Sequence, residues 1–542
     1  MATGSLRFVV VTMNGHLLGA LERAGRKAAA AGVDLRVHVA ADWGTDPEAL
    51  DACRRDLETA ELVLVSQLFL EEHATAVRDV LEENRDRYRA LVCILSEGEL
   101  VHLTRMGKLD MSSGGDEERS KWHPLSVLKR LKGERKSGGT SGKRQMMVLR
   151  TVPKILRFLP GAAQDLRAYM LTLQAWLSGS QPNLLALLLL LAERYGELDT
   201  GRDVPELRRY PDEGLYHPSL RGGRGTPQGI TERLDELPAP ADPVGTVGLL
   251  IMRSYVLAGN TAHYDAVIHA LEGRGLRVIP AFAAGLDNRS VVARYFQGAG
   301  GGSSFGGSAG RVRGRDTDVR RTNGSIKGPD AGVPTPNGGV KEPDTGITET
   351  HASPRSHGPA SGIDAVASLT GFSLVGGPAY NDAASARTML EELDVPCLTL
   401  VPLEFQTVEE WEEDDRGLNP LQTALMVSVP ELDGSVAPHV FGGRVAGADG
   451  PARDTSPVPE RVERVAERLL HMVRLRRRER AERKLAVVLF NFPPNAGAVG
   501  SAAYLDVWAS LHRTLEHLAS QGYSGSYAKG LPISGLDAVA ED

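Results

Sequence analysis

The strongest constraint on the fold is a regular alternation of short apolar runs with helix-type segments. In residues 6–100 the runs RFVVVTM, LRVHVA, ELVLVSQLF and ALVCIL are separated by predicted helices near 15–31, 47–58 and 71–88. Near-continuous Val/Leu strands joined by helices are typical of a parallel sheet covered on both faces. We therefore predict an N-terminal α/β domain of Rossmann-like or flavodoxin-like type over residues 1–104.

The same rhythm returns further along the chain. The strands VGLLIMRS and LRVIPAFA, with a helix across 263–272 between them, form one βαβ unit. After an interruption the pattern resumes with IDAVASLTGFSL, PCLTLVPL and TALMVSVPEL (423–432), all predicted as strands. This pattern predicts a second α/β domain made of residues 247–297 and 363–457.

The other segments differ in composition from these two domains. Residues 298–362 are rich in Gly, Ser, Thr and Pro with almost no large apolar side chain, so we predict a disordered insert. Residues 282–287 and 363–371 are expected to meet across its base. The remaining segments are predicted as a polar basic linker (105–150), a helical segment with a Pro/Gly-rich connector (151–246) and the start of a third, truncated domain (458–542).

Bulk properties limit the classes of function. A chain of 542 residues should hold about three to four domains, and its net charge of −7 gives no indication of nucleic acid or an anionic membrane as partner. The apolar run 184–192 is too short to span a bilayer, which needs about 20 residues. The start MATGSLRFVVVTM has no feature of a signal or transit peptide. Cys53, Cys93 and Cys397 are scattered, which favours buried thiols in a reducing compartment.

The most informative single stretch is VVLFNFPPNAGAVGSAAYLDV, residues 487–507. It is predicted as a buried strand (485–492) that breaks at two prolines, passes through a small-residue loop and enters a helix over 504–518. Gly497 and Gly500 allow close approach of the backbone to a ligand or a neighbouring strand. No Gly-Lys-Ser/Thr follows, so the loop is not a phosphate-binding loop of the Walker type.

This stretch closely resembles the signature of the large subunits of class I metal chelatases. It is most similar to the porphyrin-binding H subunit of magnesium chelatase, and less similar to the large cobaltochelatase subunit. The resemblance covers most of the chain except residues 298–362 and about the last twenty. Other stretches agree with the family in the same order: TVPK (151–154) with AQD (163–165) and LQAWL (173–177), YPDEGLYHP (210–218), SLTGFSLVGGPAYNDA (368–383), PLEFQT (402–407) and VPELDG (429–434).

The resemblance implies an enzyme subunit that takes part in (bacterio)chlorophyll biosynthesis. The reaction would be ATP-dependent insertion of Mg²⁺ into protoporphyrin IX, a ligase reaction forming nitrogen–metal bonds. ATP would be hydrolysed by partners, an AAA+ motor subunit and an adaptor subunit, which agrees with the missing phosphate-binding loop. The location would be the bacterial cytoplasm, or the plastid stroma in a eukaryote. Two alternatives stay open, a cobaltochelatase large subunit and a non-catalytic tetrapyrrole-binding or regulatory fragment.

The length departs from the family, whose members are much longer. Residues 522–542 contain no strand-like run to pair with the strand predicted at 485–492, so an edge of that sheet would stay unpaired. We therefore expect the chain to correspond to the N-terminal portion of such a subunit. The family's acid/base residues are then expected outside this chain.

Candidate site residues follow from the rule that open α/β sheets bind ligands at the carboxyl ends of their strands. Glu404 is the best carboxylate candidate for proton transfer because it stands at a strand end. His16 lies at the end of the first strand, although a structural role is the simpler interpretation there. Asp212, Glu213 and His217 have no recognisable ligand spacing, so no metal site is predicted. The further candidates for porphyrin contact are Ser373, Tyr380, Asn381, Gln406, Asn491, Gly497, Gly500 and Ser501.

Overall fold

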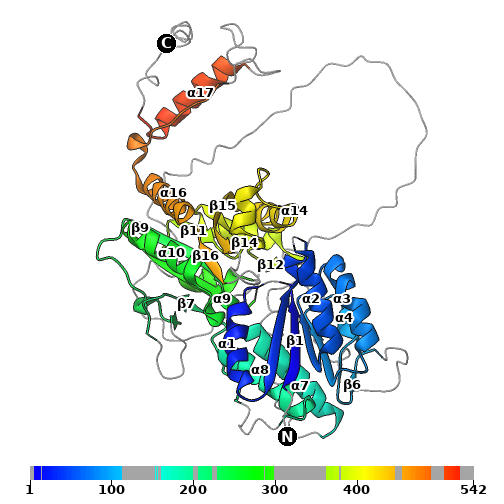
Figure 1. The fold of residues 1–542 in the computed structure, drawn as a ribbon. Helices are drawn as coiled ribbons and strands as arrows, with labels where there is room; N and C mark the ends of the chain where they lie inside the picture. The colour runs from blue at the N-terminus through cyan, green and yellow to red at the C-terminus, as the bar shows by residue number, and fades with distance from the viewer. Residues whose placement is uncertain are drawn as a thin grey trace, which may run out of the picture.

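The computed structural model contains two α/β units and one further helix (Figure 1). The predicted α/β class with successive parallel sheets is confirmed. The disordered insert predicted at 298–362 lies outside the described residues except for residue 362, so it stays a prediction. The structure describes residues 5–13, 15–44, 46–112, 153, 156, 160–198, 205–221, 229–285, 287–297, 362–377, 380–445, 454–489 and 506–524.

The first unit is a six-stranded sheet in the order β2-β1-β3-β4-β5-β6. Its first four strands are parallel, and a short antiparallel hairpin extends it. The hairpin uses residues that the sequence analysis placed in a polar linker, and it is held there because Met106 and Met111 are fully buried. The strands are β1 (Leu6–Thr12), β2 (Val33–Val39), β3 (Leu62–Ser66), β4 (Ala90–Ile94), β5 (Arg105–Met106) and β6 (Leu109–Asp110).

Alternate side chains of this sheet enter two separate cores. Phe8 and Val10 pack on one face against α1 (Leu18–Ala29), whereas Val9 and Val11 pack on the other. The second face is covered by α2 (Pro47–Thr59) and α3 (Glu71–Asn84), with α4 (Gly98–His102) beside them. The first face is completed by two helices from later in the chain, α7 (Ala162–Ser178) and α8 (Gln181–Tyr195).

The second unit is an eight-stranded sheet in the order β16-β15-β14-β11-β9-β10-β7-β8. The five strands from β15 to β10 are parallel, and the strands at both edges are antiparallel. The strands are β7 (Glu213–Tyr216), β8 (Ile230–Thr231), β9 (Gly245–Met252), β10 (Leu276–Ala283), β11 (Ala365–Ser368), β14 (Cys397–Thr407), β15 (Val436–Arg444) and β16 (Thr455–Pro457).

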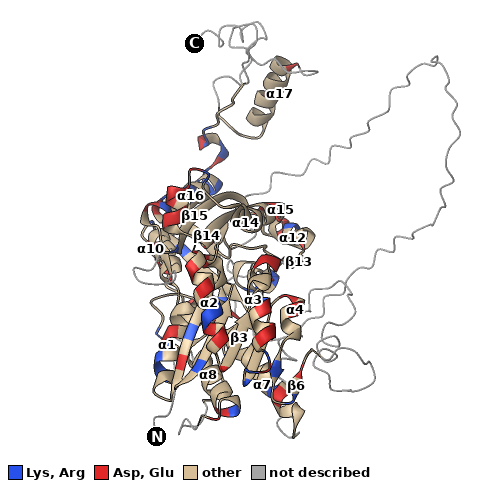
Figure 2. Cartoon of the chain, turned by 45° about the vertical axis from the view of Figure 1, so that its right-hand side comes forward, with Lys and Arg blue, Asp and Glu red and all other residues tan. Residues whose placement is uncertain are grey.

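Helices cover both faces of the second sheet as well. On one face lie α10 (Ala262–Glu272) and α16 (Pro459–Arg477), and on the other lie α12 (Ala383–Leu393) and η3 (Val292–Gln297). A short helix, α9 (Arg253–Ala258), follows β9 directly. Figure 2 shows arginines gathered toward the carboxyl end of α16, near the connection to α17 (Val507–Ser520).

The strand predicted at 423–432 is wrong. These residues form the end of α14 (Pro420–Thr423), then η5 (Ala424–Ser428) and α15 (Val429–Leu432). Asn419 caps this helical stretch by accepting a hydrogen bond from the Gln422 N–H, and Met426 is buried against the sheet. The strand position beside β14 is taken by β15, which the sequence analysis did not predict.

The prediction of a buried strand at 485–492 is also wrong for residues 485–489, the part of it that the structure describes. Residues 483–489 form neither helix nor strand, and the side chain of Val488 is 92% exposed. Neither edge of the second sheet, β16 or β8, pairs with this segment. The helix predicted to follow is present as α17, at Val507–Ser520 rather than 504–518.

Two smaller expectations are also modified. The stretch Tyr210–Pro218, interpreted as a rigid connector, contains strand β7, which pairs with β10. The segments flanking the insert do meet, through a bridge between Asp287, the last residue of the first expected segment, and Val375, four residues beyond the end of the second. None of the helices in the described part of the chain combines the length and apolar character that a membrane crossing requires.

Because α8 shares a core with the first sheet, Leu188→Ala should lower the free energy of unfolding by about 2–5 kcal/mol. Leu188 is fully buried in that core, whereas Leu190 on the same helix is only partly buried. Chemical denaturation of both alanine variants measures the difference. Equal losses for Leu188→Ala and Leu190→Ala would contradict this packing.

Candidate functional site at the junction of the two sheets

The carboxyl edges of the two sheets face one another. His16 follows β1, and its ring stacks on that of Tyr255 in α9, which follows β9, with 5.2 Å between ring centroids. Asp42, in the 3₁₀ turn η1 (Ala40–Asp42) that follows β2, pairs with Arg444 at the end of β15. In open α/β sheets this edge is where ligands bind. The junction between the two edges is therefore the candidate functional site.

Glu404 occupies the centre of this junction. It lies near the carboxyl end of β14 and is 4% exposed. Its Oε1 accepts a short hydrogen bond from the Tyr255 hydroxyl, while its Oε2 has no partner among the described residues. Burial raises the pKa of Glu404 to about 7, against a smaller opposing effect of the Arg444 charge. A carboxyl group with this pKa can bind or release a proton near neutral pH.

Aromatic rings surround the hydrogen-bond partner of Glu404, Tyr255. The ring of Tyr255 lies 5.3 Å from that of His263 and 5.9 Å from that of Tyr264, measured between centroids. His263 is fully buried, and neither ring nitrogen has a hydrogen-bond partner among the described residues. Burial lowers the pKa of His263 to about 3 and that of His16 to about 4, so both imidazoles are neutral at physiological pH.

Two further side chains place hydrogen-bond donors beside the carboxylate. The Gln422 Oε1 accepts from the backbone N–H groups of Glu404 (2.8 Å) and Phe405 (3.0 Å), which leaves its Nε2 without a partner in the described part of the chain. The Arg444 Nε is likewise buried and without a described partner. Among the described residues, three neighbouring elements of the junction thus carry one buried acceptor oxygen and two buried donor nitrogens without partners, and buried groups of this kind commonly bind water or a small polar ligand.

Polar contacts around Glu404 hold the two α/β units together at the junction. The Asn260 side chain donates to the His16 carbonyl (3.3 Å) and accepts from the Thr455 N–H (2.9 Å). The Arg23 guanidinium donates to the Ala258 carbonyl at 2.7 Å. The bonds from Asn260 to the His16 carbonyl and from Arg23 in α1 to the Ala258 carbonyl cross between the two units, whereas the bond between Asn260 and Thr455 lies within the second unit. The two edges are therefore held in a fixed relation.

A carboxylate of the second unit also lies against the start of α1. Asp454 is so close to Gly19 that a Cβ there would lie 2.4 Å from Oδ1 and 2.5 Å from Oδ2. An acidic group is favourable at the amino end of a helix because of the helix dipole. An alanine at position 19 would therefore require the Asp454 side chain to move away from the helix.

The predicted site residues that the structure describes do not lie together in one place. Only Glu404 lies at the centre of the junction. Gln406 is buried two residues on, where its Oε1 accepts from the Asn419 N–H (2.7 Å) and its Nε2 donates to the Gly417 carbonyl (3.2 Å), which is a structural role. Asn491, Gly497, Gly500 and Ser501 lie outside the described residues, and the roles of all these residues remain predictions.

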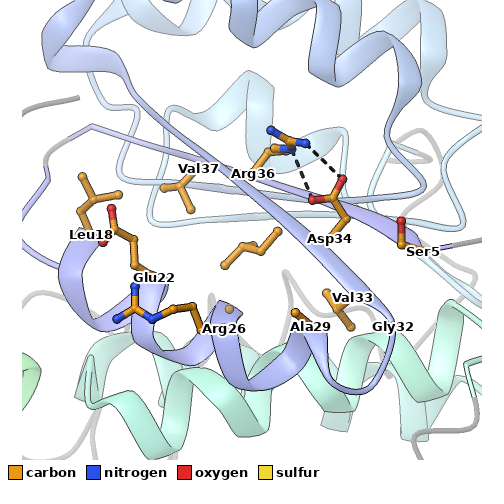
Figure 3. Close-up of a pocket in the computed structure, with 12 residues that line it drawn as sticks. Ser5, Leu18, Glu22, Arg26, Ala29, Gly32, Val33, Asp34, Arg36 and Val37 are labelled. Carbon is orange, nitrogen blue, oxygen red and sulfur yellow. Dashed lines mark hydrogen bonds and ion pairs between the residues drawn. The ribbon is translucent and has the colours of Figure 1, made fainter. Parts of the chain in front are cut away.

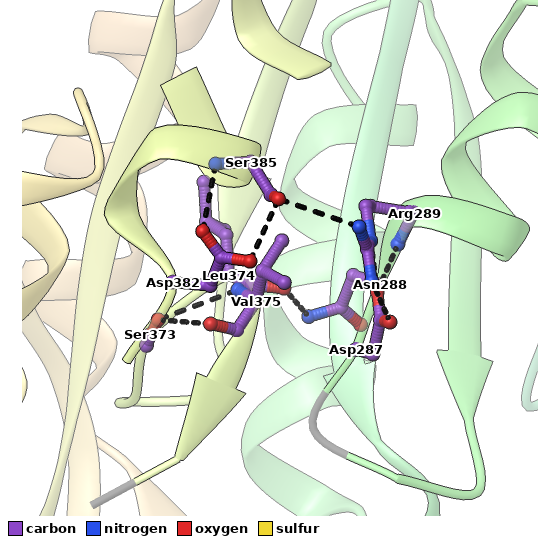
Figure 4. Close-up of polar contacts among 8 residues, drawn as sticks. All are labelled: Asp287, Asn288, Arg289, Ser373, Leu374, Val375, Asp382 and Ser385. Carbon is purple, nitrogen blue, oxygen red and sulfur yellow. Dashed lines mark hydrogen bonds and ion pairs between the residues drawn. The ribbon is translucent and has the colours of Figure 1, made fainter. Parts of the chain in front are cut away.

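Asn381 belongs to a different polar cluster, near the base of the insert, and Figure 4 shows part of this cluster. Together with Tyr380 it forms strand β13 (Tyr380–Asn381), which pairs with β12 (Gly376–Gly377). The Ser373 hydroxyl donates to Asp433 Oδ2 at 2.7 Å and lies 3.1 Å from Asn381 Oδ1. Asn288 reaches across the base and donates to the Leu374 carbonyl at 3.0 Å. The hydrogen bonds of this cluster hold together the loop that follows β10 and the loop that follows β11.

The sequence analysis missed Tyr255, His263, Gln422 and Arg444. Tyr255 and Arg444 stand at the carboxyl ends of β9 and β15, so the strand-end rule could have selected them. Arg444 was missed because β15 itself was not predicted. His263 and Gln422 lie within helices, and nothing in their local sequence distinguishes them.

A surface hollow of about 580 Å³ lies elsewhere, between α1 and the edge strand β2 (Figure 3). Its walls combine the charged residues Glu22, Arg26 and Arg36 with apolar ones such as Leu18. Arg36 and Asp34 bond to one another there, as the dashed lines in Figure 3 show. None of the predicted site residues lines it. Among the described residues no three His, Cys, Asp or Glu side chains are grouped as a metal site would require.

Comparison with known proteins identifies the family. The family model described as CobN/Magnesium Chelatase matches residues 173–309 and 341–532, and a domain of unknown function matches residues 7–170. The chain belongs to the CobN/magnesium chelatase family. The resemblance inferred from the motifs is thereby confirmed.

Within the family, magnesium chelatase subunits are similar to this chain over nearly all of its length. The magnesium-chelatase H subunit of Cereibacter sphaeroides is 39% identical over 539 residues, covering 96% of this chain and 39% of the relative. The chloroplastic magnesium-chelatase ChlH subunit of Oryza sativa is 34% identical, covering 90% of this chain and 31% of the relative. The chain thus spans about two fifths or less of the length of these relatives.

Cobaltochelatase proteins match less well. The aerobic cobaltochelatase CobN subunit of a Sinorhizobium species is 24% identical over 52% of this chain and 17% of the relative. A solved structure, the catalytic subunit of cobaltochelatase from Mycobacterium tuberculosis, covers 99% of this chain and 32% of that one at 18% identity, with a TM-score of 0.44.

Protonation of Glu404 should make stability depend on pH. Its folded-state pKa of about 7 lies above the ordinary 4.5, so its stabilising effect is complete below about pH 4.5 and is lost as the pH rises through 7. Between pH 5 and 8 the free energy of unfolding should fall by an amount on the order of 3 kcal/mol more in the wild type than in Glu404→Gln. Denaturant titrations across this range measure the effect, with Glu412→Gln, an exposed carboxylate, as control. Parallel pH profiles for wild type and Glu404→Gln would show that Glu404 does not titrate there.

Gly19→Ala should loosen the contact between the two units, because the new Cβ would displace the Asp454 carboxylate. We expect a loss of about 1–3 kcal/mol in unfolding free energy. Gly44→Ala is the control, since a Cβ there meets no atom within 4 Å. In the double variant Gly19→Ala/Asp454→Ala most of the loss should disappear, and additive losses would rule out a clash with Asp454.

Proposed function

We propose that this chain is part of the large, porphyrin-binding subunit of a magnesium chelatase, as in chlorophyll or bacteriochlorophyll synthesis. The substrates are protoporphyrin IX and Mg²⁺, and the reaction is ATP-dependent metal insertion. The observation that carries the proposal is the 39% identity over 539 residues to a protein named as the H subunit of magnesium chelatase. The location follows the source, cytoplasm for a bacterial protein and plastid stroma for a plant one.

The chemistry of insertion defines what such a subunit must supply. The macrocycle loses two pyrrole protons as the metal enters, so a base is needed beside it. Mg²⁺ gives up its water shell reluctantly, which fits coupling to ATP hydrolysis. The sequence has no Walker-type loop, so we assign hydrolysis to separate motor and adaptor subunits.

Glu404 is our candidate for one proton-accepting group. It is the carboxyl group of the junction whose pKa lies near neutrality, and Tyr255 fixes its orientation through a hydrogen bond. The imidazoles of His16 and His263 are neutral at physiological pH, so neither adds a positive charge that would lower the pKa of Glu404 further. The candidates for contact with the porphyrin are still Tyr380, Asn381, Gln406, Asn491, Gly497, Gly500 and Ser501.

A second candidate function is a tetrapyrrole-holding or regulatory protein without catalysis of its own. A cobaltochelatase role is the weaker alternative, because that match covers 52% of this chain against 96% for the magnesium enzyme.

A porphyrin titration followed by an insertion assay tests the proposal. Tryptophan fluorescence of the purified chain should be quenched saturably by a water-soluble porphyrin. The same sample is then assayed for Mg²⁺ insertion with ATP and the two smaller subunits of a bacterial magnesium chelatase. Binding with insertion supports the enzyme, and binding without insertion supports the holding protein. Absence of both would overturn a porphyrin-binding role for this chain.

A further inference from the structure

Strand β2 is the longest open sheet edge in the described part of the chain. It contains seven residues, whereas the other edge strands of the two large sheets are β6 and β8, with two residues each, and β16, with three. Natural proteins usually keep open edge strands short, because the unpaired N–H and C=O groups of a long edge can bind another strand. No described residue pairs with the outer side of β2, so this edge is a candidate interaction surface.

The register with β1 shows which backbone groups of β2 point outward. The Leu6 N–H donates to the Gly32 carbonyl at 2.8 Å, and Leu6 lies opposite Val33. In a parallel pair, alternate residues direct both of their backbone groups to the same neighbouring strand. The even-numbered residues of β2 therefore bond to β1, and the odd-numbered residues turn their N–H and C=O groups away from it. The open edge thus offers the backbone groups of Val33, Leu35 and Val37.

The side chains along β2 are only partly covered. Leu35 and Val37 pack against the core beneath α1, but both are partly exposed and line the hollow between α1 and β2 (Figure 3). Asp34 and Arg36 project from the other face of the strand, with 3.4 Å between Asp34 Oδ1 and Arg36 Nε. A strand added at this edge would therefore cover the two apolar side chains and lie beside the two charged ones.

The two charges favour a second copy of β2 as the added strand, and they select its register. In an antiparallel pair with a two-fold axis at Leu35, Asp34 of each copy lies directly opposite Arg36 of the other. These are positions without backbone hydrogen bonds between them, where side chains approach most closely. A shift of the axis by one residue, to Asp34 or to Arg36, places two like charges opposite one another, which is destabilising.

Helix α1 carries a matching pair of charges over the same strand. Glu22 and Arg26 are exposed, lie one helical turn apart and both line the hollow. A Cβ at Gly25 would lie 2.8 Å from Leu35 Cδ2, so this part of α1 lies over the centre of β2. A two-fold axis at Leu35 therefore brings one acidic and one basic residue from each α1 to the shared face.

We propose that β2 is the interface of a symmetric dimer, in which two copies of the chain join their first sheets edge to edge with Leu35 on the two-fold axis. The two six-stranded sheets then form one continuous sheet. Such an interface uses the same patch on both copies, so each patch must be complementary to itself, as the charges of β2 are. None of these residues is a candidate for proton transfer or porphyrin contact, so the dimer does not depend on the proposed function.

Size-exclusion chromatography with light scattering, performed on the complete chain over a range of concentrations, measures the association. We expect a dimer at micromolar concentration. Asp34→Arg and Arg36→Asp each place like charges opposite one another, so each should weaken the dimer by about tenfold or more. The double variant Asp34→Arg/Arg36→Asp has opposite charges at these positions again, so it should dimerise like the wild type.

A mixture of the two single variants tests the register directly. In a heterodimer of Asp34→Arg with Arg36→Asp, both facing positions carry opposite charges, so mixing should restore association. A variant that had merely lost its fold would not be restored in this way. Asp414→Arg and Arg416→Asp are the matched controls, because these residues also form an ion pair two positions apart, with 3.0 Å between Arg416 Nε and Asp414 Oδ1, but lie outside any strand. Both controls should dimerise like the wild type.

Three results would overturn the proposal. The first is a chain that stays monomeric at every concentration reached. The second is a dimer that the variants of Asp34 and Arg36 leave intact, or that the variants of Asp414 and Arg416 weaken equally, because the interface would then lie elsewhere. The third is a mixture of the two single variants that fails to associate, since the register centred on Leu35 requires that it does.

Discussion

The ion pair between Arg444 and Asp42 is the interaction on which the junction depends. It joins the end of β15 to the turn after β2, 402 residues apart in the chain, with the Arg444 side chain 3% exposed. Breaking a buried pair by removing one partner typically costs about 3–5 kcal/mol, because the other charge is left without compensation. The pair therefore fixes the two sheet edges together, and only in that arrangement can Tyr255 reach both His16 and Glu404.

The strand-end rule explains how much of the site could be predicted. Glu404 was selected from the sequence because a carboxylate followed a buried apolar run. Its hydrogen-bond partner Tyr255 lies 149 residues earlier, and no local pattern connects the two. The raised pKa is likewise a property of the assembled junction, since burial between two units causes it. Sequence patterns therefore identified the position, whereas the chemistry depends on tertiary contacts.

The two failed strand predictions have a common physical origin. An apolar run at 423–432 and another at 485–489 both suit a strand, but a strand needs a neighbour with free backbone groups. Beside β14 that place is taken by β15, so the first run becomes helical and covers the sheet instead. The second run has no neighbour among the described residues and lies exposed. The strand and helix alternation in 6–100 succeeded because each strand there has its neighbour close in sequence.

The pairing of β9 with β11 has a consequence for the order in which the chain acquires structure. The Asp364 carboxylate accepts from the Thr246 N–H across a separation of 118 residues, and it also binds Arg477 near the end of α16. Strand β9 of the second sheet can therefore pair with β11 only after β11 has been synthesised. All strands of the first sheet, in contrast, are complete by residue 110. Contacts of such long separation slow folding, and domains generally fold as they leave the ribosome. We expect the nascent second unit to be the part that needs chaperones.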